Sequence, residues 1–242
     1  MDVGNKIRVD DGCSFTFSKG TASVFDSHVQ NSVPLYSEGH QYITYLSDYF
    51  IKSNSTCYDL GCSTGTLLEI LAERHKNKDN VHFLGIDPEI EMINQAMKKN
   101  NYANIEFYVN SAEEVKLEKC DFVISYYTLQ FIPISKRQEV CNKIYSSLNI
   151  GGAFILFEKE LVTEPYISKI VESAYMKFKL NNNFTVNEVM GKRFSLEGFL
   201  IPNTTDDNIS LLASAGFTSI QCIMQYGEFK GYIAIKKVNN EK

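Results

Sequence analysis

The sequence of 242 residues lacks several features that mark particular classes of protein. It has no apolar run near the roughly 18 residues of a transmembrane helix, and it does not begin with the basic, apolar and small-residue order of a secretory signal. Its six cysteines form no CxxC pair and no zinc-ligand spacing, and its four histidines show no metal spacing. These absences argue against a membrane-bound, secreted or metal-binding protein. They predict a soluble cytoplasmic protein with buried free thiols.

The chain also lacks an excess of positive charge. Its 24 Lys and Arg residues against 29 Asp and Glu give a net charge of −5. This balance argues against a large basic surface, so we expect no direct nucleic-acid binding. There are no internal repeats and no low-complexity tracts. A hydrophobic fraction of 44% fits an ordinary globular chain, and at this length we expect one α/β unit with additions.

The most informative stretch is Tyr-Asp-Leu-Gly-Cys-Ser-Thr-Gly-Thr, at residues 58–66. Strand-forming residues there run through Asp59 into a small-residue turn, and an apolar-periodic helix follows. The turn contains Gly61, Cys62, Ser63 and Gly65. Such a strand–turn–helix brings backbone N–H groups close to a bound nucleoside. The next strand ends at Asp87, about 20 residues further on, where a ribose-binding carboxylate belongs. Together they predict a nucleoside cofactor.

The identity of the turn residues narrows the choice of nucleoside. A dinucleotide site has glycine at the first, third and sixth turn positions, which here are Gly61, Ser63 and Thr66. A Walker phosphate loop needs Gly-Lys-Ser/Thr, but Thr66 and Leu67 follow Gly65. S-adenosylmethionine has no phosphate and needs a close backbone approach with a ribose carboxylate. The sequence favours it, with a turn that only packs strand on helix as the alternative.

Strands and helices alternate from residue 57 onward, which predicts a parallel sheet with helices on both faces. We expect helices at 39–50, 66–75, from Pro88 on, 137–148, 165–180, 185–190 and 206–215, and strands at 81–87, 105–109, 121–126, 153–157, 219–225 and 232–236. The last two strands should be antiparallel, because their link is short. Gly151-Gly152 should turn the chain into its strand, and Gly191-Lys192-Arg193 should follow the 185–190 helix. Inward positions should include Leu67, Leu68, Ile70, Leu71, Ile90, Ile93 and Met97.

Two parts are expected in the domain organisation. Residues 1–54 form an N-terminal helical segment that covers the cofactor site, with residues 1–12 poorly ordered. Residues 55–242 form the core, with a helical cap inserted at about 161–205. This insertion has more apolar positions than a solvated loop needs, which predicts a cap and a homodimer interface. Those positions are Ile167, Ile170, Val171, Tyr175 and Phe178.

Three segments resemble the successive motifs of class I S-adenosylmethionine-dependent methyltransferases. They are Asp59-Leu60-Gly61-Cys62-Ser63-Thr64-Gly65, Gly85-Ile86-Asp87 and Leu148-Asn149-Ile150-Gly151-Gly152. The resemblance covers about residues 55–160 and the final strand pair. It implies a Rossmann-like α/β fold with a seven-stranded, mostly parallel sheet whose last strand is antiparallel.

A narrower resemblance, from about residue 15 to residue 236, is to the carboxy-S-adenosylmethionine synthases. It is carried by the segments 32–36, 58–63, 128–131, 143–145, 158–159 and 191–193. It implies S-adenosylmethionine or carboxy-S-adenosylmethionine as cofactor, prephenate as carboxyl donor, and a product used in tRNA wobble-uridine modification. Two alternatives stay open. One is a methyltransferase or carboxymethyltransferase acting on a small molecule or tRNA, and the other is a non-catalytic cofactor-binding protein.

The same resemblance implies roles for individual residues. The cofactor site would comprise Tyr36, Asp59, Gly61, Cys62, Ser63, Gly65, Asp87, Pro88, Ser111, Ala112, Tyr126 and Arg193. Asp87 would accept from the ribose hydroxyls, and Ser111 and Ala112 would flank the adenine. Tyr36, Tyr126 and Arg193 are the candidate catalytic residues.

Arg193 would bind the added carboxylate, because guanidinium offers two parallel donors. A packing tyrosine at Tyr36 and a surface arginine at Arg193 are the alternatives. The sequence departs from the family at Tyr126, where asparagine is usual, and at Ser111, where aspartate is usual. These departures leave donor chemistry and acceptor specificity open.

Overall fold

The computed structural model describes residue 3 and residues 21–238. The expectation of poor order over residues 1–12 therefore lies outside the described residues, apart from Val3. Within them, no helix is long and apolar enough to cross a membrane.

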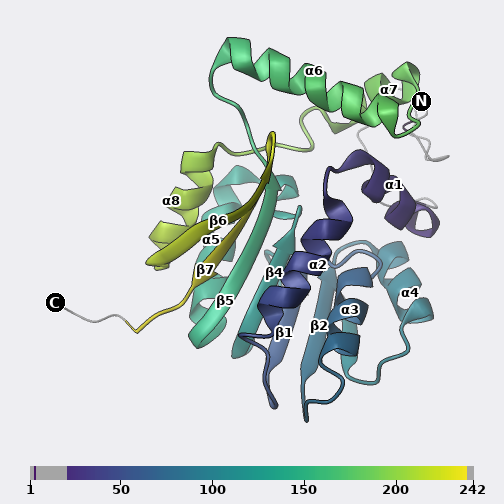
Figure 1. Ribbon diagram of the computed structural model, residues 1–242. Coiled ribbons are helices and arrows are strands. Elements are labelled where there is room, and N and C mark those ends of the chain that lie inside the picture. The colour runs from purple at the N-terminus through teal and green to yellow at the C-terminus, as the bar shows by residue number, and fades with distance from the viewer. Residues whose placement is uncertain (1–2, 4–20, 239–242) are drawn as a thin grey trace.

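A seven-stranded sheet forms the centre of the molecule (Figure 1). The strands are β1 Thr56–Leu60, β2 His82–Asp87, β3 Ile105–Val109, β4 Cys120–Tyr126, β5 Leu148–Lys159, β6 Ser219–Tyr226 and β7 Phe229–Ile235. Their spatial order is β3-β2-β1-β4-β5-β7-β6, and β7 is antiparallel to both of its neighbours. The order reverses beside β1, and ligands bind in open α/β sheets at such a switch point. The predicted fold class is confirmed.

Helices cover both faces of this sheet (Figure 1). They are η1 Thr21–Ser23, α1 Phe25–Ser32, α2 Tyr36–Ser47, α3 Thr66–Arg74, α4 Ile90–Lys99, η2 Leu129–Phe131, α5 Ile134–Ser147, α6 Pro165–Asn181, α7 Val186–Leu196 and α8 Thr205–Ala215. One apolar core joins the sheet to α2, α3 and α4 through Ile43, Leu68 and Ile93. A second core joins it to α5 and α8 through Ile144 and Leu212. The alternation of side chains along each strand supplies both cores.

The inward faces of α3 and α4 differ from the prediction. In α4, Met92, Ile93 and Ala96 are buried, whereas Ile90 and Met97 are each 53% exposed. The helix begins at Ile90 rather than Pro88, and its small Ala96 lies against the turn at Gly65, where a larger side chain would not fit. In α3, Leu67, Leu68 and Leu71 are buried but Ile70 is 40% exposed.

Two glycine-containing segments were predicted wrongly, Gly151-Gly152 as a turn ahead of the strand and 191–193 as lying beyond the helix at 185–190. Gly151 and Gly152 lie within β5, because α5 ends at Ser147 and the strand begins at once at Leu148. The segment 191–193 lies inside α7, which starts at a Thr185–Glu188 capping box and continues to Leu196. The cysteine expectation holds at residues 57, 62, 120 and 141, but Cys222 is an exposed thiol on β6.

Candidate functional site

A cavity of about 790 Å³ lies at the carboxyl ends of the parallel strands. Residues that follow β1, β2, β3, β4 and β5 form its floor, and side chains of α1, α6 and α7 complete the wall. In Figure 1 these three helices lie together across that end of the sheet. The volume is within the range of about 300–1,000 Å³ that small-molecule sites occupy.

The turn after β1 forms the central part of the floor. Gly61 has φ +81°, in the left-handed region, and both its N–H and that of Cys62 donate to the carbonyl of Ile86. A Cβ on Gly61 would lie 2.0 Å from Oγ1 of Thr128. The turn therefore requires glycine on two grounds, backbone conformation and space. Its backbone can approach a ligand closely because no side chain stands between them.

Asp87 closes the floor at the end of β2. Its Oδ2 accepts from the backbone N–H of Ser63 at 2.9 Å, and its Oδ1 accepts from that of Glu89 at 2.9 Å. Burial raises the pKa of this carboxyl to about 6, against the effect of the two N–H donors. Each carboxylate oxygen keeps further acceptor capacity for a ligand hydroxyl.

Asp59 lies beside the floor rather than in it. It lines a smaller adjoining pocket together with Cys62, Tyr36 and Tyr126. The side chain is buried, and within the described chain its Oδ1 has no hydrogen-bond partner. Burial, followed by repulsion from Asp87, raises the pKa of Asp59 to about 7. A buried acceptor without a partner costs stability, so this oxygen suits a cationic donor from a ligand.

Aromatic rings line the next part of the wall. The ring of Tyr36 lies 5.0 Å from that of Tyr126 and 6.3 Å from that of Tyr127. The Tyr126 hydroxyl donates to the Tyr36 carbonyl at 2.7 Å and so ties the start of α2 to the end of β4. A Cβ on Gly39 would lie 2.1 Å from that hydroxyl. The bulk of Tyr126 therefore fits because residue 39 has no side chain.

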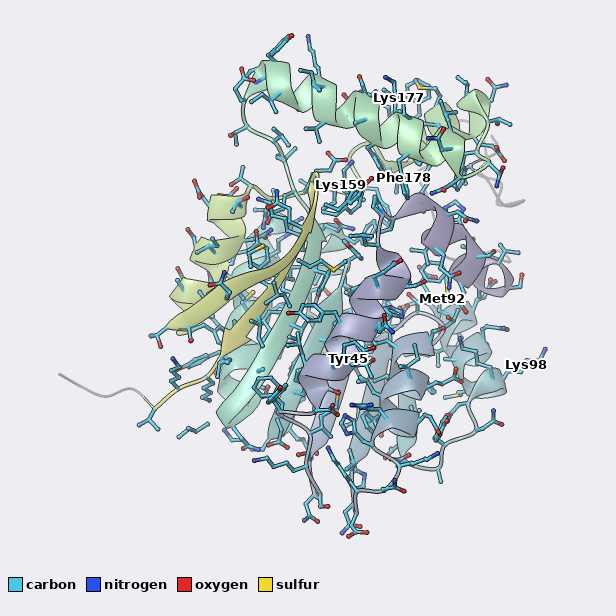
Figure 2. The ribbon with its side chains drawn as sticks, viewed as in Figure 1. Tyr45, Met92, Lys98, Lys159, Lys177 and Phe178 are labelled. Atoms are coloured by element: carbon cyan, nitrogen blue, oxygen red, sulfur yellow. The ribbon has the colours of Figure 1, made fainter. Side chains whose placement is uncertain are left out.

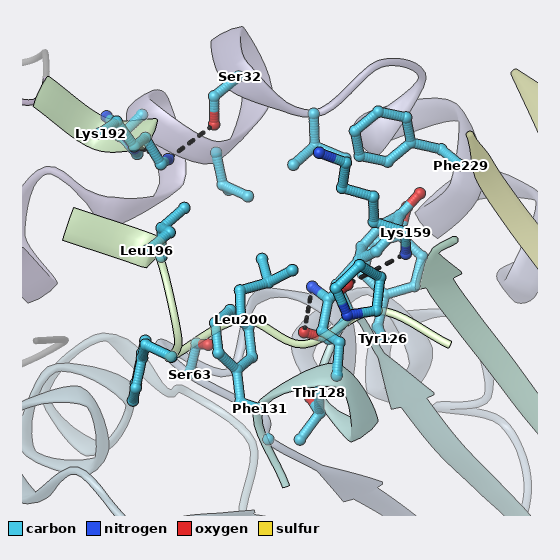
Figure 3. Close-up of a pocket in the computed structure, with 18 of the residues that line it drawn as sticks. Ser32, Ser63, Tyr126, Thr128, Phe131, Lys159, Lys192, Leu196, Leu200 and Phe229 are labelled. Carbon is cyan, nitrogen blue, oxygen red and sulfur yellow. Dashed lines mark hydrogen bonds between the residues drawn. The ribbon is translucent and has the colours of Figure 1, made fainter. Parts of the chain in front are cut away.

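The cap side of the cavity is basic. Lys159, Lys179, Lys192 and Arg193 all line it. Arg193 stands at its rim, where its guanidinium pairs with Glu172 at 2.8 Å and its side chain is 51% exposed. Figure 3 shows the hydrogen bond from Lys192 to Ser32 at the cavity wall.

The structure brings most of the predicted site residues together. The cavity wall includes Tyr36, Gly61, Ser63, Asp87, Pro88, Ser111, Ala112, Tyr126 and Arg193. Asp59 and Cys62 line only the smaller pocket. Gly65 lines neither pocket. It packs instead, since a Cβ there would lie 2.6 Å from the ring of Phe107. Gly65 therefore serves the turn and not a direct contact across the cavity.

Several lining residues received no cavity role from the sequence, among them Tyr127, Tyr175, Lys179 and Phe229. Tyr175 and Lys179 are four residues apart on α6, so they share one helix face, and this spacing was the available signal. Tyr127 has φ +60°, an unusual conformation for a bulky residue that only the folded chain reveals. Phe229 begins β7 and reaches the cavity across the sheet.

Comparisons with known proteins agree with this geometry. A methyltransferase domain model matches residues 58–152. The carboxy-S-adenosyl-L-methionine synthase of Campylobacter lari is 37% identical over 224 residues, covering 92% of this chain and 94% of the relative. The synthase of Staphylococcus epidermidis is 36% identical, covering 90% and 95%.

A solved structure described as an S-adenosylmethionine-dependent methyltransferase, from Methanococcus maripaludis, superposes with a TM-score of 0.63. It is 17% identical, and the match covers 95% of this chain and 98% of that one. At this identity the likeness concerns the fold alone. The identities of 36–37% over nine-tenths of the chain decide the family. The chain belongs to the carboxy-S-adenosyl-L-methionine synthase family, within the class I methyltransferase fold.

Proposed function

We propose that this protein binds S-adenosyl-L-methionine and transfers a carboxyl group from an anionic donor, prephenate, to the cofactor methyl group. One observation carries the proposal beyond family membership, namely the charge distribution across the cavity. Asp87, Glu89 and Glu113 lie at the floor, while at the cap Lys159, Lys179, Lys192 and Arg193 outnumber the carboxylates Glu172 and Glu197. A neutral methyl group needs no basic wall, whereas a carboxylate does.

The floor fits the cofactor. The carboxylate of Asp87 would accept from the ribose hydroxyls, and the unpartnered Oδ1 of Asp59 would accept from the cationic amino group. Ser111 and Ala112 would flank the adenine. When bound, the cofactor supplies a sulfonium methyl group as the carboxyl acceptor. The donor would lose carbon dioxide and hydroxide as its ring aromatises, the hydroxide would take a proton from the methyl group to give water, and the carbon dioxide would bond to the methyl carbon. The rings of Tyr36, Tyr126, Tyr127 and Phe229 would exclude water from that region.

Arg193 is proposed to hold the new carboxylate. Its guanidinium is half-exposed and paired with Glu172, so truncation should cost less than at a fully desolvated ion pair. We expect Arg193→Ala to weaken binding of carboxy-S-adenosylmethionine about 10-fold while leaving S-adenosylmethionine affinity within about twofold. Isothermal titration of both ligands measures this selectivity, with Lys177→Ala on the exposed face of α6 as the control.

A second function is favoured by the same ion pair. Because Arg193 already has a partner in Glu172, the protein could instead be a methyltransferase that never binds a carboxylated cofactor. Unchanged affinity for S-adenosylmethionine in Arg193→Ala, together with no binding of the carboxylated cofactor by the wild type, would support that alternative.

We also propose that the segment 161–205 acts as a cap over the site, that residues 1–54 cover the cofactor, and that the protein is a cytoplasmic homodimer whose product serves tRNA modification. Exposed apolar side chains on α6, namely Tyr166, Ile167 and Ile170, support an interface there. Light scattering at micromolar concentration should give the mass of a dimer. A monomer under those conditions would rule the dimer out.

A further inference from the structure

Three lysines from three separate elements converge on the cap side of the cavity. Lys159 is the last residue of β5, Lys179 lies near the end of α6, and Lys192 lies within α7. All three line the cavity. Figure 2 places Lys159 beneath α6, and Lys177 of that helix is exposed. Lysine side chains are mostly exposed in folded proteins, so three of them lining one cavity call for an explanation.

Their contacts leave positive charge facing the cavity. Lys159 pairs with Glu228 at 3.1 Å and also lies 5.0 Å from the ring centroid of Tyr175. Lys179 is buried and lies 4.4 Å from the same ring, and within the described residues it forms no ion pair. The Tyr175 ring therefore has two ammonium groups beside it, and the carboxylates nearby are those of Glu228, which pairs with Lys159, and Glu172, which pairs with Arg193.

Lys192 stands apart from this pair. Its ammonium contacts Nε2 of His28 and lies 3.3 Å from Oγ of Ser32, both on α1. In Figure 3 it is on the opposite side of the cavity from Lys159 and Phe229. The cavity thus has two separate positive regions, and Tyr127 and Phe229 are among the aromatic side chains that line it.

The lowered pKa values of two of these lysines show that their charged forms are destabilised in the ligand-free protein. Burial, with repulsion from Lys159, lowers the pKa of Lys179 to about 8. Burial, with repulsion from Lys179 and Lys159, lowers the pKa of Lys192 to about 7. Like charges held together in a desolvated site are stabilised when an anion arrives, and a stability cost at a site is typical of function.

We propose that Lys159, Lys179 and Lys192 form the subsite that binds the two carboxylates of the donor substrate. The ligand class is a small dicarboxylate with an apolar ring, because two positive regions lie on opposite sides of a cavity whose lining includes aromatic side chains. The inference rests on the proposed function, and it adds a residue set distinct from Arg193. Lys159 and Lys179 hold one carboxylate over the edge of Tyr175, and Lys192 with Ser32 holds the other.

The experiment measures donor binding separately from catalysis. The protein is saturated with S-adenosylhomocysteine, which has no methyl group to react, and prephenate is titrated into it by calorimetry. We expect Lys179→Met and Lys192→Met each to weaken prephenate binding about 10- to 100-fold, because each removes a charged donor. Lys177→Met, on the exposed face of α6, should bind like the wild type.

Two control measurements distinguish loss of the subsite from general disruption of the protein. Methionine fills a similar volume without a buried charge, so melting temperatures of the variants should be equal to or above that of the wild type. Affinity for S-adenosylhomocysteine itself should be unchanged, which a general disruption of the site would not allow.

The outcomes separate this inference from the proposed function. Wild-type binding of prephenate that persists undiminished in both lysine variants overturns the subsite and leaves the donor proposal standing. Failure of the wild type to bind prephenate overturns the donor, and the subsite is then tested with phthalate, an aromatic dicarboxylate. Phthalate bound by the wild type and lost in both variants supports the subsite, whereas no binding by the wild type overturns it.

Discussion

Replacing Asp59 with asparagine should make the ligand-free protein more stable and its cofactor binding weaker. Asp59 is buried with one unpartnered oxygen, and its pKa is raised from 3.8 to about 7. A shift of that size corresponds to a cost of roughly 4 kcal/mol for the ionised form in the folded state. Because an amide also leaves polar atoms buried, we expect Asp59→Asn to recover about 1–3 kcal/mol at pH 8.

The sign of the pH dependence follows from the direction of the shift. A carboxyl whose folded pKa is raised binds its proton more tightly in the folded state than in the unfolded one. Its destabilising effect is therefore fully present above about pH 7 and is progressively lost as the pH falls from there towards 3.8. The stability gain of Asp59→Asn should accordingly be larger at pH 8 than at pH 5.

Urea unfolding of the ligand-free protein at both pH values measures this difference, and calorimetry measures cofactor affinity. We expect S-adenosylmethionine to bind about 10- to 100-fold more weakly, since a charged acceptor is lost. Asp79→Asn, at an exposed carboxylate, is the matched control and should change neither quantity. If Asp59→Asn is less stable than the wild type at pH 8, then the Asp59 carboxylate stabilises the folded protein, which contradicts the prediction.

Gly39→Ala should destabilise the protein by about 2–4 kcal/mol, although alanine normally favours a helix interior. Gly39 lies within α2, and a Cβ there would lie 2.1 Å from the Tyr126 hydroxyl and 3.0 Å from its ring carbon Cζ. Tyr126 must move, and its hydrogen bond to the Tyr36 carbonyl is lost. Chemical unfolding of the single variant gives the magnitude.

The double variant tests whether the hydroxyl is the cause. Tyr126→Phe removes the atom that meets the new methyl group, so Gly39→Ala should cost much less in that background. A coupling free energy of about 1 kcal/mol or more between the two positions is expected, since they are in direct contact. If the stability changes of the two single variants add up in the double variant, the Tyr126 hydroxyl does not clash with the new methyl group. The absence of a side chain at Gly39 would then not be needed to accommodate Tyr126.

Local chemistry explains which parts of the site could be predicted. The turn at Gly61 and the carboxylate of Asp87 lie within two consecutive strand–helix units, so periodicity and glycine placement were enough. The parallel sheet followed from the same alternation. The buried faces of α3 and α4 could not be predicted in the same way. A small residue such as Ala96 gives no strong sequence signal of burial, although it lies at a close contact.

The cap side of the cavity could not be predicted from the sequence, because residues far apart in the chain form it. Tyr175 and Lys179 belong to α6, and only the folded chain carries that helix over the end of β5, where Lys159 lies. The relation between Gly39 and Tyr126 joins residues 87 positions apart, by the difference of their numbers. Arg193 was predicted from its place in a motif, but motif position did not reveal its pairing with Glu172 or its exposure.

Mass spectrometry of the cofactor tests whether the protein carboxylates S-adenosylmethionine. Purified protein is incubated with S-adenosylmethionine and prephenate, and the ligands released on denaturation are analysed by mass spectrometry. The expected result is a sulfonium species heavier than S-adenosylmethionine by one carbon dioxide, formed only when both substrates and the protein are present. Recovery of unmodified S-adenosylmethionine alone, from protein shown to bind it and supplied with saturating prephenate, would contradict the account.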